Sequence, residues 1–114
     1  MHDDHHISLY EAFLKLGTYE EVKNFLIDLC TPQELKALNE RWNVCQLLND
    51  GKLSYRQISE ITGSSTTTIS RVSRFLNDEP HSGYRNLLNK LKKEKNDVKN
   101  DDGETIDNCR KFAM

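Results

Sequence analysis

The chain has 114 residues, of which 36% are hydrophobic and 30% are charged, and its formal net charge is −2. This length suits one small domain with a modest core, which argues against a large enzyme with a deeply buried site. No apolar run approaches the roughly 20 residues of a membrane span, and the polar, acidic start is unlike a secretory signal.

The basic and acidic side chains are unevenly distributed. Residues 1–53 hold 5 basic and 9 acidic groups, a net charge of −4, whereas residues 54–93 hold 7 basic and 3 acidic groups, a net charge of +4. Residues 94–114 return to −2. The near-neutral total therefore conceals a basic central segment, which is typical of a nucleic-acid-binding element.

The first half of the chain contains three helix-start signals, at residues 8–11, 18–21 and 31–34. Each places Ser or Thr three residues before Glu, which is the pattern of a capping box, and Pro32 suits a first helical position. Gly17 and residues 49–51 end the first and third helices. Apolar residues at helical spacing follow each start: Leu9, Phe13 and Leu16; Val22, Phe25, Leu26 and Leu29; Leu35, Leu38, Trp42, Cys45 and Leu48.

The second half predicts three more helices. One begins with a capping box at residues 54–57 and ends near Gly63, one spans about 65–76, and the last follows Ser82. From about residue 94 there is no sustained apolar period, so a disordered tail is expected over 94–114. The expected fold is all-α with six helices: a flexible start over 1–7, a dimerisation and core region over 8–53, a central pair over 54–76, and a helix over 77–93 that completes the dimer core.

Residues 54–76 have the features of a helix-turn-helix. Ser59 supplies a small side chain where the second helix crosses the first, and Gly63 releases the chain into the turn without a Cβ penalty. The apolar residues expected to pack the two helices together are Ile58, Ile61, Ile69 and Val72.

The second helix of this pair has two different faces. At about 100° per residue, one face is polar and basic, with short hydroxyls near its start and arginines further on, and the opposite face is apolar. Short side chains let a helix approach the major groove closely, and arginine bonds phosphates or a guanine edge. The polar set is Thr66, Thr67, Ser70, Arg71, Ser73 and Arg74, and the apolar set is Ile69, Val72, Phe75 and Leu76.

Two alternatives concern this segment. The β-branched residues 66–69 are poor helix formers and would also suit a strand or loop, although no partner strand is evident. A marginal helix that orders fully only on DNA is one hypothesis. The helix-turn-helix would otherwise serve protein–protein contact, but the local charge of +4 and the arginines at 56, 71 and 74 favour DNA.

Together these segments resemble the Trp repressor superfamily, and specifically its YerC/YecD-type TrpR-related branch. The resemblance runs from about Leu9 to Leu91 and rests on residues 29–38, Arg41, and residues 47–51, 54–59 and 67–71. It implies an intertwined homodimer whose two helix-turn-helix heads bind a two-fold operator in double-stranded DNA. For DNA binding it implies a base contact by Arg56 and groove-facing positions for Thr66, Thr67 and Ser70, with Ser59 in place of a DNA-contacting lysine. Our expected set of DNA-binding residues adds Ser65, Arg71 and Arg74.

The resemblance also implies a corepressor pocket, which departs from the family pattern. Thr31, Arg41 and Arg71 match residues that surround bound L-tryptophan, but Val72 replaces a glycine and Phe75 replaces a small serine. We therefore expect a vestigial pocket that is closed or suited to something else, and L-tryptophan is not the expected ligand. The sequence identifies no other effector. Surface ion pairing or phosphate contact is the favoured role for both arginines.

Other reactive side chains give weaker signals. Cys30, Cys45 and Cys109 are widely spaced and form no C-x-x-C pair, so neither a zinc site nor a disulfide framework is expected. Cys30 and Cys45 fall on apolar helical faces and are expected to pack as small hydrophobes. The sequence predicts no enzyme, no metal site and no cofactor, and a reducing cytoplasm is the simplest compartment. The terminal group His2, Asp3, Asp4, His5 and His6 is expected to bind metal only adventitiously, and His81 is expected in a loop.

Overall fold

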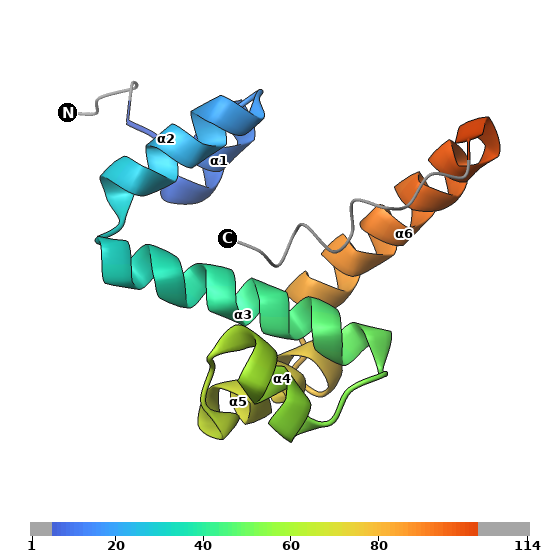
Figure 1. The fold of residues 1–114 in the computed structure, drawn as a ribbon. Helices are drawn as coiled ribbons and strands as arrows, with labels where there is room; N and C mark the ends of the chain where they lie inside the picture. The colour runs from blue at the N-terminus through green and yellow to red at the C-terminus, as the bar shows by residue number, and fades with distance from the viewer. Residues whose placement is uncertain (1–5, 103–114) are drawn as a thin grey trace. The chain divides into compact units, whose positions relative to one another are not determined.

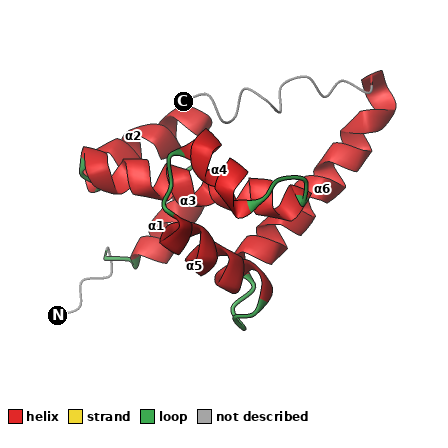
Figure 2. Cartoon of the chain, turned by 60° about the horizontal axis from the view of Figure 1, so that its bottom comes forward, coloured by secondary structure: helices red, strands yellow, loops and turns green. Residues whose placement is uncertain are grey.

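The computed structural model describes residues 6–102, which form six helices and contain no strand (Figures 1 and 2). This confirms the all-α prediction. None of the helices in that part of the chain is long and apolar enough to cross a membrane. The terminal His and Asp residues at positions 2–5, Cys109 and the rest of 103–114 lie outside the described residues. The helices are α1 (Leu9–Lys15), α2 (Tyr19–Leu29), α3 (Pro32–Asp50), α4 (Tyr55–Thr62), α5 (Thr66–Asn77) and α6 (Gly83–Asp102).

The helix starts follow the capping signals of the sequence. The boxes at 8–11 and 31–34 form: each hydroxyl accepts from the glutamate N–H at 3.1 Å, and each carboxylate accepts from the cap N–H, at 3.0 and 2.8 Å. The box at α2 is half formed. Thr18 accepts from the N–H of Glu21, but the Glu21 carboxylate accepts from the N–H of Gly17 at 2.6 Å instead.

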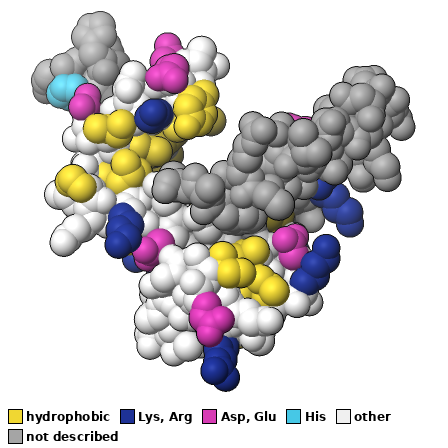
Figure 3. All heavy atoms as spheres, viewed as in Figure 1, with side chains coloured by type: hydrophobic (Ala, Val, Ile, Leu, Met, Phe, Trp, Pro, Cys, Tyr) yellow, Lys and Arg dark blue, Asp and Glu magenta, His cyan; other side chains and the backbone are white. Residues whose placement is uncertain are grey.

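The chain divides into two compact units, an N-terminal unit (Met1–Ala37) and a C-terminal unit (Leu38–Met114). In the N-terminal unit, α1 and α2 contact each other through Phe13 and Phe25, whose rings meet edge to face at 5.5 Å. None of the residues in these two helices is buried. Hydrophobic side chains accordingly appear on their surface (Figure 3). The large apolar residues that this unit exposes are Ile7, Leu9, Tyr10, Phe13, Leu14, Tyr19, Ile27 and Leu29.

The C-terminal unit has a closed hydrophobic core to which four helices contribute. Val44 and Leu47 of α3 are buried beside Cys45, although only Cys45 lay on the expected apolar stripe. Trp42 packs against this core from its edge and stacks on Tyr84 of α6, with ring centroids 6.5 Å apart. The buried core residues are Val44, Cys45, Leu47, Ile58, Ile69, Val72, Leu76 and Leu88.

The two cysteines in the described part of the chain differ in environment. Cys45 is fully buried, as expected for a small hydrophobe. Burial raises the pKa of its thiol from 9.0 to about 11, with a smaller opposing effect of Arg85. Cys30 is half-buried and is the C-cap residue of α2, where its N–H donates to the carbonyl of Leu26.

The last helix is longer than the sequence analysis predicted. We expected disorder from residue 94, but α6 continues to Asp102. Residues 84–102 contain neither glycine nor proline and include several lysines, which are good helix formers. A helix therefore propagates beyond its last apolar residues, because propagation is far easier than nucleation.

Candidate nucleic-acid interface

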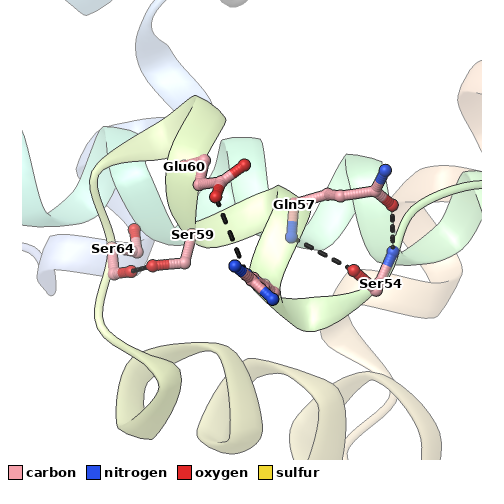
Figure 4. A network of polar contacts seen from close by, with 6 residues as sticks. Ser54, Gln57, Ser59, Glu60 and Ser64 are labelled. Carbon is pink, nitrogen blue, oxygen red and sulfur yellow. Dashed lines mark hydrogen bonds and ion pairs between the residues drawn. The ribbon is translucent and has the colours of Figure 1, made fainter.

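The turn between α4 and α5 is fixed by backbone geometry and by one serine. Gly63 adopts the left-handed conformation, with φ 78°, and its N–H donates to the carbonyl of Ser59 at 2.9 Å. The Ser59 hydroxyl donates to the carbonyl of Ser64 at 2.7 Å (Figure 4). Ser59 thus bridges the end of α4 to the turn by a hydrogen bond, whereas the sequence predicted only a small side chain at this position.

The packing of α4 against α5 differs at one residue from the expectation. Ile58, Ile69 and Val72 are fully or almost fully buried, as expected for a helix-turn-helix. Ile61 was expected in the same contact, but it is 57% exposed. The packed face of α4 follows residues 58, 59 and 62, and Ile61 lies about 100° around the helix from the centre of that face.

The two faces of α5 are separated as the helical wheel predicts. Ile69, Val72 and Leu76 are buried, and the polar face is exposed except for half-buried Ser73. The β-branched start is helical, not a strand, and Ser65 caps it: its hydroxyl accepts from the N–H of Thr68 at 3.1 Å. The exposed residues of the polar face are Thr66, Thr67, Ser70, Arg71 and Arg74.

The three arginines of this region have different partners. The Arg56 side chain is 89% exposed and lies 3.9 Å from the Glu60 carboxylate, a distance at which an exposed pair contributes little. Nε of Arg74 lies 3.4 Å from the carboxylate of Glu79. The guanidinium of Arg71 lies over the Phe75 ring, 4.4 Å from its centroid. Sequence reasoning missed Glu79, because the loop that returns it to Arg74 has no periodic pattern.

Arg85 of α6 joins the ends of two other helices. It donates to the side-chain carbonyl of Asn49, at the end of α3, at 2.8 Å, and to that of Asn77, the last residue of α5, at 3.3 Å. Asn77 in turn donates to the Ser73 hydroxyl at 3.5 Å. This clamp ties the end of α5 to the end of α3 and to α6. No sequence signal indicated it, since Asn49 and Arg85 are 36 residues apart.

A cavity of about 350 Å³ lies beside α5. Four of the five residues assigned to the vestigial pocket line it, and the fifth, Thr31, belongs to the N-terminal unit, where its hydroxyl caps α3. The lining therefore keeps an open cavity even though it contains Val72 and Phe75. The full lining is Arg41, Arg71, Val72, Phe75, His81, Ser82, Gly83 and Tyr84.

The charges around this cavity act on one phenol. Burial raises the pKa of Tyr84, the nearby Cys45 adds to that rise, and Arg41 and Arg71 lower it.

Ser82, also in the lining, has φ 57°, a conformation that is uncommon for residues other than glycine. His81 is exposed and precedes it in the loop, where we expected it.

The sequence and the fold of this chain are similar to those of several known proteins. Residues 5–92 match the family model of the Trp repressor protein. YerC of Bacillus subtilis is 39% identical over 84 residues, which cover 74% of this chain and 79% of that protein. A Trp operon repressor homolog of Aliivibrio fischeri is 41% identical over 73 residues, 61% of this chain and 68% of that protein. The crystal structure of a TrpR-like protein from Eubacterium eligens superposes with a TM-score of 0.68 at 38% identity, covering 73% of this chain and 84% of that one.

Proposed function

The chain belongs to the Trp repressor family, and we propose that it is a regulator of transcription that binds a two-fold DNA operator as a homodimer. The observation that carries this proposal is the geometry of α5. One face of the helix is buried in the core, and the other presents hydroxyls and arginines to solvent. A helix held in this way by a preceding helix and a tight turn is suited to enter the major groove.

The side chains of this interface differ in length, and their length decides which part of the DNA each can contact. Short hydroxyls on the first turns of α5 allow close approach to base edges, and the exposed Arg56 guanidinium has the fork geometry that pairs with guanine. Arginines later on α5 are placed for phosphates, which fix register without reading sequence. We assign base contacts to Arg56, Thr66, Thr67 and Ser70. We assign phosphate contacts to Arg71 and Arg74. Ser65 caps α5 and so fixes where the groove-facing helix begins.

The N-terminal unit supports the dimer part of the proposal. Its helices bury none of their own residues and expose a series of large apolar side chains, Tyr10 and Leu14 each by 82%. Exposed apolar surface of this kind marks a protein–protein contact. In a two-fold dimer the two recognition helices would enter successive major grooves, about 34 Å apart.

We further propose that L-tryptophan is not the corepressor of this protein. Val72 and Phe75 both line the cavity beside α5, and the Phe75 ring already lies against the guanidinium of Arg71. An indole would compete with that ring for the same guanidinium face. Calorimetry is expected to show no micromolar binding of L-tryptophan, and such binding would contradict this part of the proposal.

Selection of bound duplexes from random DNA tests the proposed function. The selected sequences should contain two related half-sites. Arg56→Ala and Thr67→Ala should relax the sequence preference, whereas Arg74→Ala should weaken binding to all sequences and flatten the dependence of affinity on salt. Lys23→Ala, which removes one exposed positive charge on α2, is the matched control and should leave the sequence preference unchanged.

Two outcomes would contradict the proposal. The first is the absence of a complex with any duplex at low salt. The second is binding to a protein partner that is insensitive to salt, without affinity for DNA, which would identify the helix-turn-helix as a protein-interaction module.

A further inference from the structure

Phe75 contacts both arginines that we assign to DNA phosphates. The centroid of its ring lies 4.4 Å from Cζ of Arg71 and 5.2 Å from Cζ of Arg74. Both distances are within the roughly 6 Å over which a guanidinium is attracted to an aromatic face. Phe75 is itself half-buried, at the boundary between the packed and the polar face of α5.

The positions of the three residues on α5 explain this contact. Arg71 precedes Phe75 by four residues, so the two side chains lie one above the other on the helix surface. Arg74 is the adjacent residue, and its Nε is also 3.4 Å from the Glu79 carboxylate. By contrast, Arg56 on α4 is 89% exposed and has only the 3.9 Å pair with Glu60. The arginines of α5 are therefore held, whereas Arg56 is comparatively free.

We propose that Phe75 is a positioning residue for DNA binding, whose ring holds the guanidinium groups of Arg71 and Arg74 in place before DNA arrives. This proposal rests on the proposed function. A free arginine side chain loses much rotamer freedom when it binds a phosphate, and prior restraint reduces that loss. A guanidinium stacked on a ring uses its face for the ring, which leaves its edge N–H groups for phosphate oxygens.

A double-mutant cycle tests this role. Affinity for a duplex obtained by selection is measured for the full chain, for Phe75→Leu and for Phe75→Tyr, each with and without Arg71→Ala and Arg74→Ala. Phe75→Leu keeps an apolar side chain but removes the ring, and it should weaken binding about tenfold. Phe75→Tyr keeps the ring and should bind within about twofold of the wild type. Without the two arginines, Phe75→Leu should cause no further loss, because the coupling has been removed.

The unfolding midpoint of each variant is measured alongside, and Phe75→Met replaces Phe75→Leu if the leucine variant does not fold. The proposal is overturned if Phe75→Leu binds like the wild type, if Phe75→Tyr is as weak as Phe75→Leu, or if Phe75→Leu causes the same loss without the arginines. Wild-type protein that binds no DNA would overturn the proposed function as well. Wild-type protein that binds DNA, with additive losses in the cycle, would overturn only the role of Phe75.

Discussion

The two units of this chain use the same kind of helix with opposite results. Both are built from capped, amphipathic helices, but the described part of the C-terminal unit buries eight apolar residues in one core, whereas α1 and α2 bury none. A capping box and an apolar stripe therefore specify a helix, but they do not specify which segment or molecule buries its apolar face. In the C-terminal unit the apolar faces of the helices bury one another. In the N-terminal unit we propose that a second copy of the chain buries these faces.

The largest expected effect is on the proposed dimer contact of the N-terminal unit. Tyr10 and Leu14 lie one turn apart on α1 and are each 82% exposed. Replacing both with aspartate should destabilise the dimer by about 6–12 kcal/mol, because each buried apolar side chain contributes about 1.5–3 kcal/mol and a dimer contains four of them. Sedimentation equilibrium measures this change. Lys15→Asp, which alters the net charge by the same amount, is the control, and unchanged self-association of the double variant would contradict the prediction.

The core of the C-terminal unit should show the next largest effect. Ile69→Ala removes a fully buried side chain and should lower the free energy of unfolding by about 3 kcal/mol. Ile61→Ala makes the same chemical change at a side chain that is 57% exposed, and it should cost less than about 1 kcal/mol. Urea denaturation measures both. Equal losses would mean that the two isoleucines are not in different environments.

The buried thiol of Cys45 should make stability depend on pH. Its pKa is raised from 9.0 to about 11, so the folded chain holds this proton to higher pH than the unfolded chain does. The corresponding stability is complete below pH 9 and is lost as the pH rises towards 11, by about 2 kcal/mol. The difference between the wild type and Cys45→Ala in denaturation at pH 8, 9, 10 and 11 isolates this effect. Parallel curves for the two proteins would contradict it.

The smallest effect concerns the turn that presents α5. Gly63→Ala should destabilise by about 1 kcal/mol, because φ is 78° and a Cβ is unfavourable there although no atom lies within 4 Å. Gly83 also has open space around its Cβ position but no positive φ. Gly83→Ala is therefore the matched control and should not destabilise. Thermal unfolding distinguishes the two, and equal midpoints would exclude backbone strain at Gly63.

The features that the sequence predicted correctly are those decided within a few residues. Caps at Ser8, Thr31 and Ser54, the turn at Gly63 and the two faces of α5 depend on local hydrogen bonds and on helical periodicity. Each is complete within one or two turns of chain. Periodicity in a single sequence is sufficient to find such features.

The features that it missed depend on contacts between distant segments. The exposure of Ile61 depends on which residues of α4 face α5, and the clamp of Arg85 joins the ends of three helices. The cavity beside α5 is also lined by Tyr84 and by the loop at Ser82, which follow α5 in the chain. None of these is visible in the spacing of residues along one helix.

Footprinting with hydroxyl radicals on a selected duplex tests the central claim most directly, because it reports which stretches of the DNA backbone are covered and whether they have a two-fold arrangement. The wild-type protein should protect two equivalent backbone regions about one helical turn apart, related by a two-fold axis. The aspartate variant at positions 10 and 14 should lose that paired pattern. A single asymmetric protected region, or no protection at low salt, would contradict the proposal that two copies of α5 bind one operator.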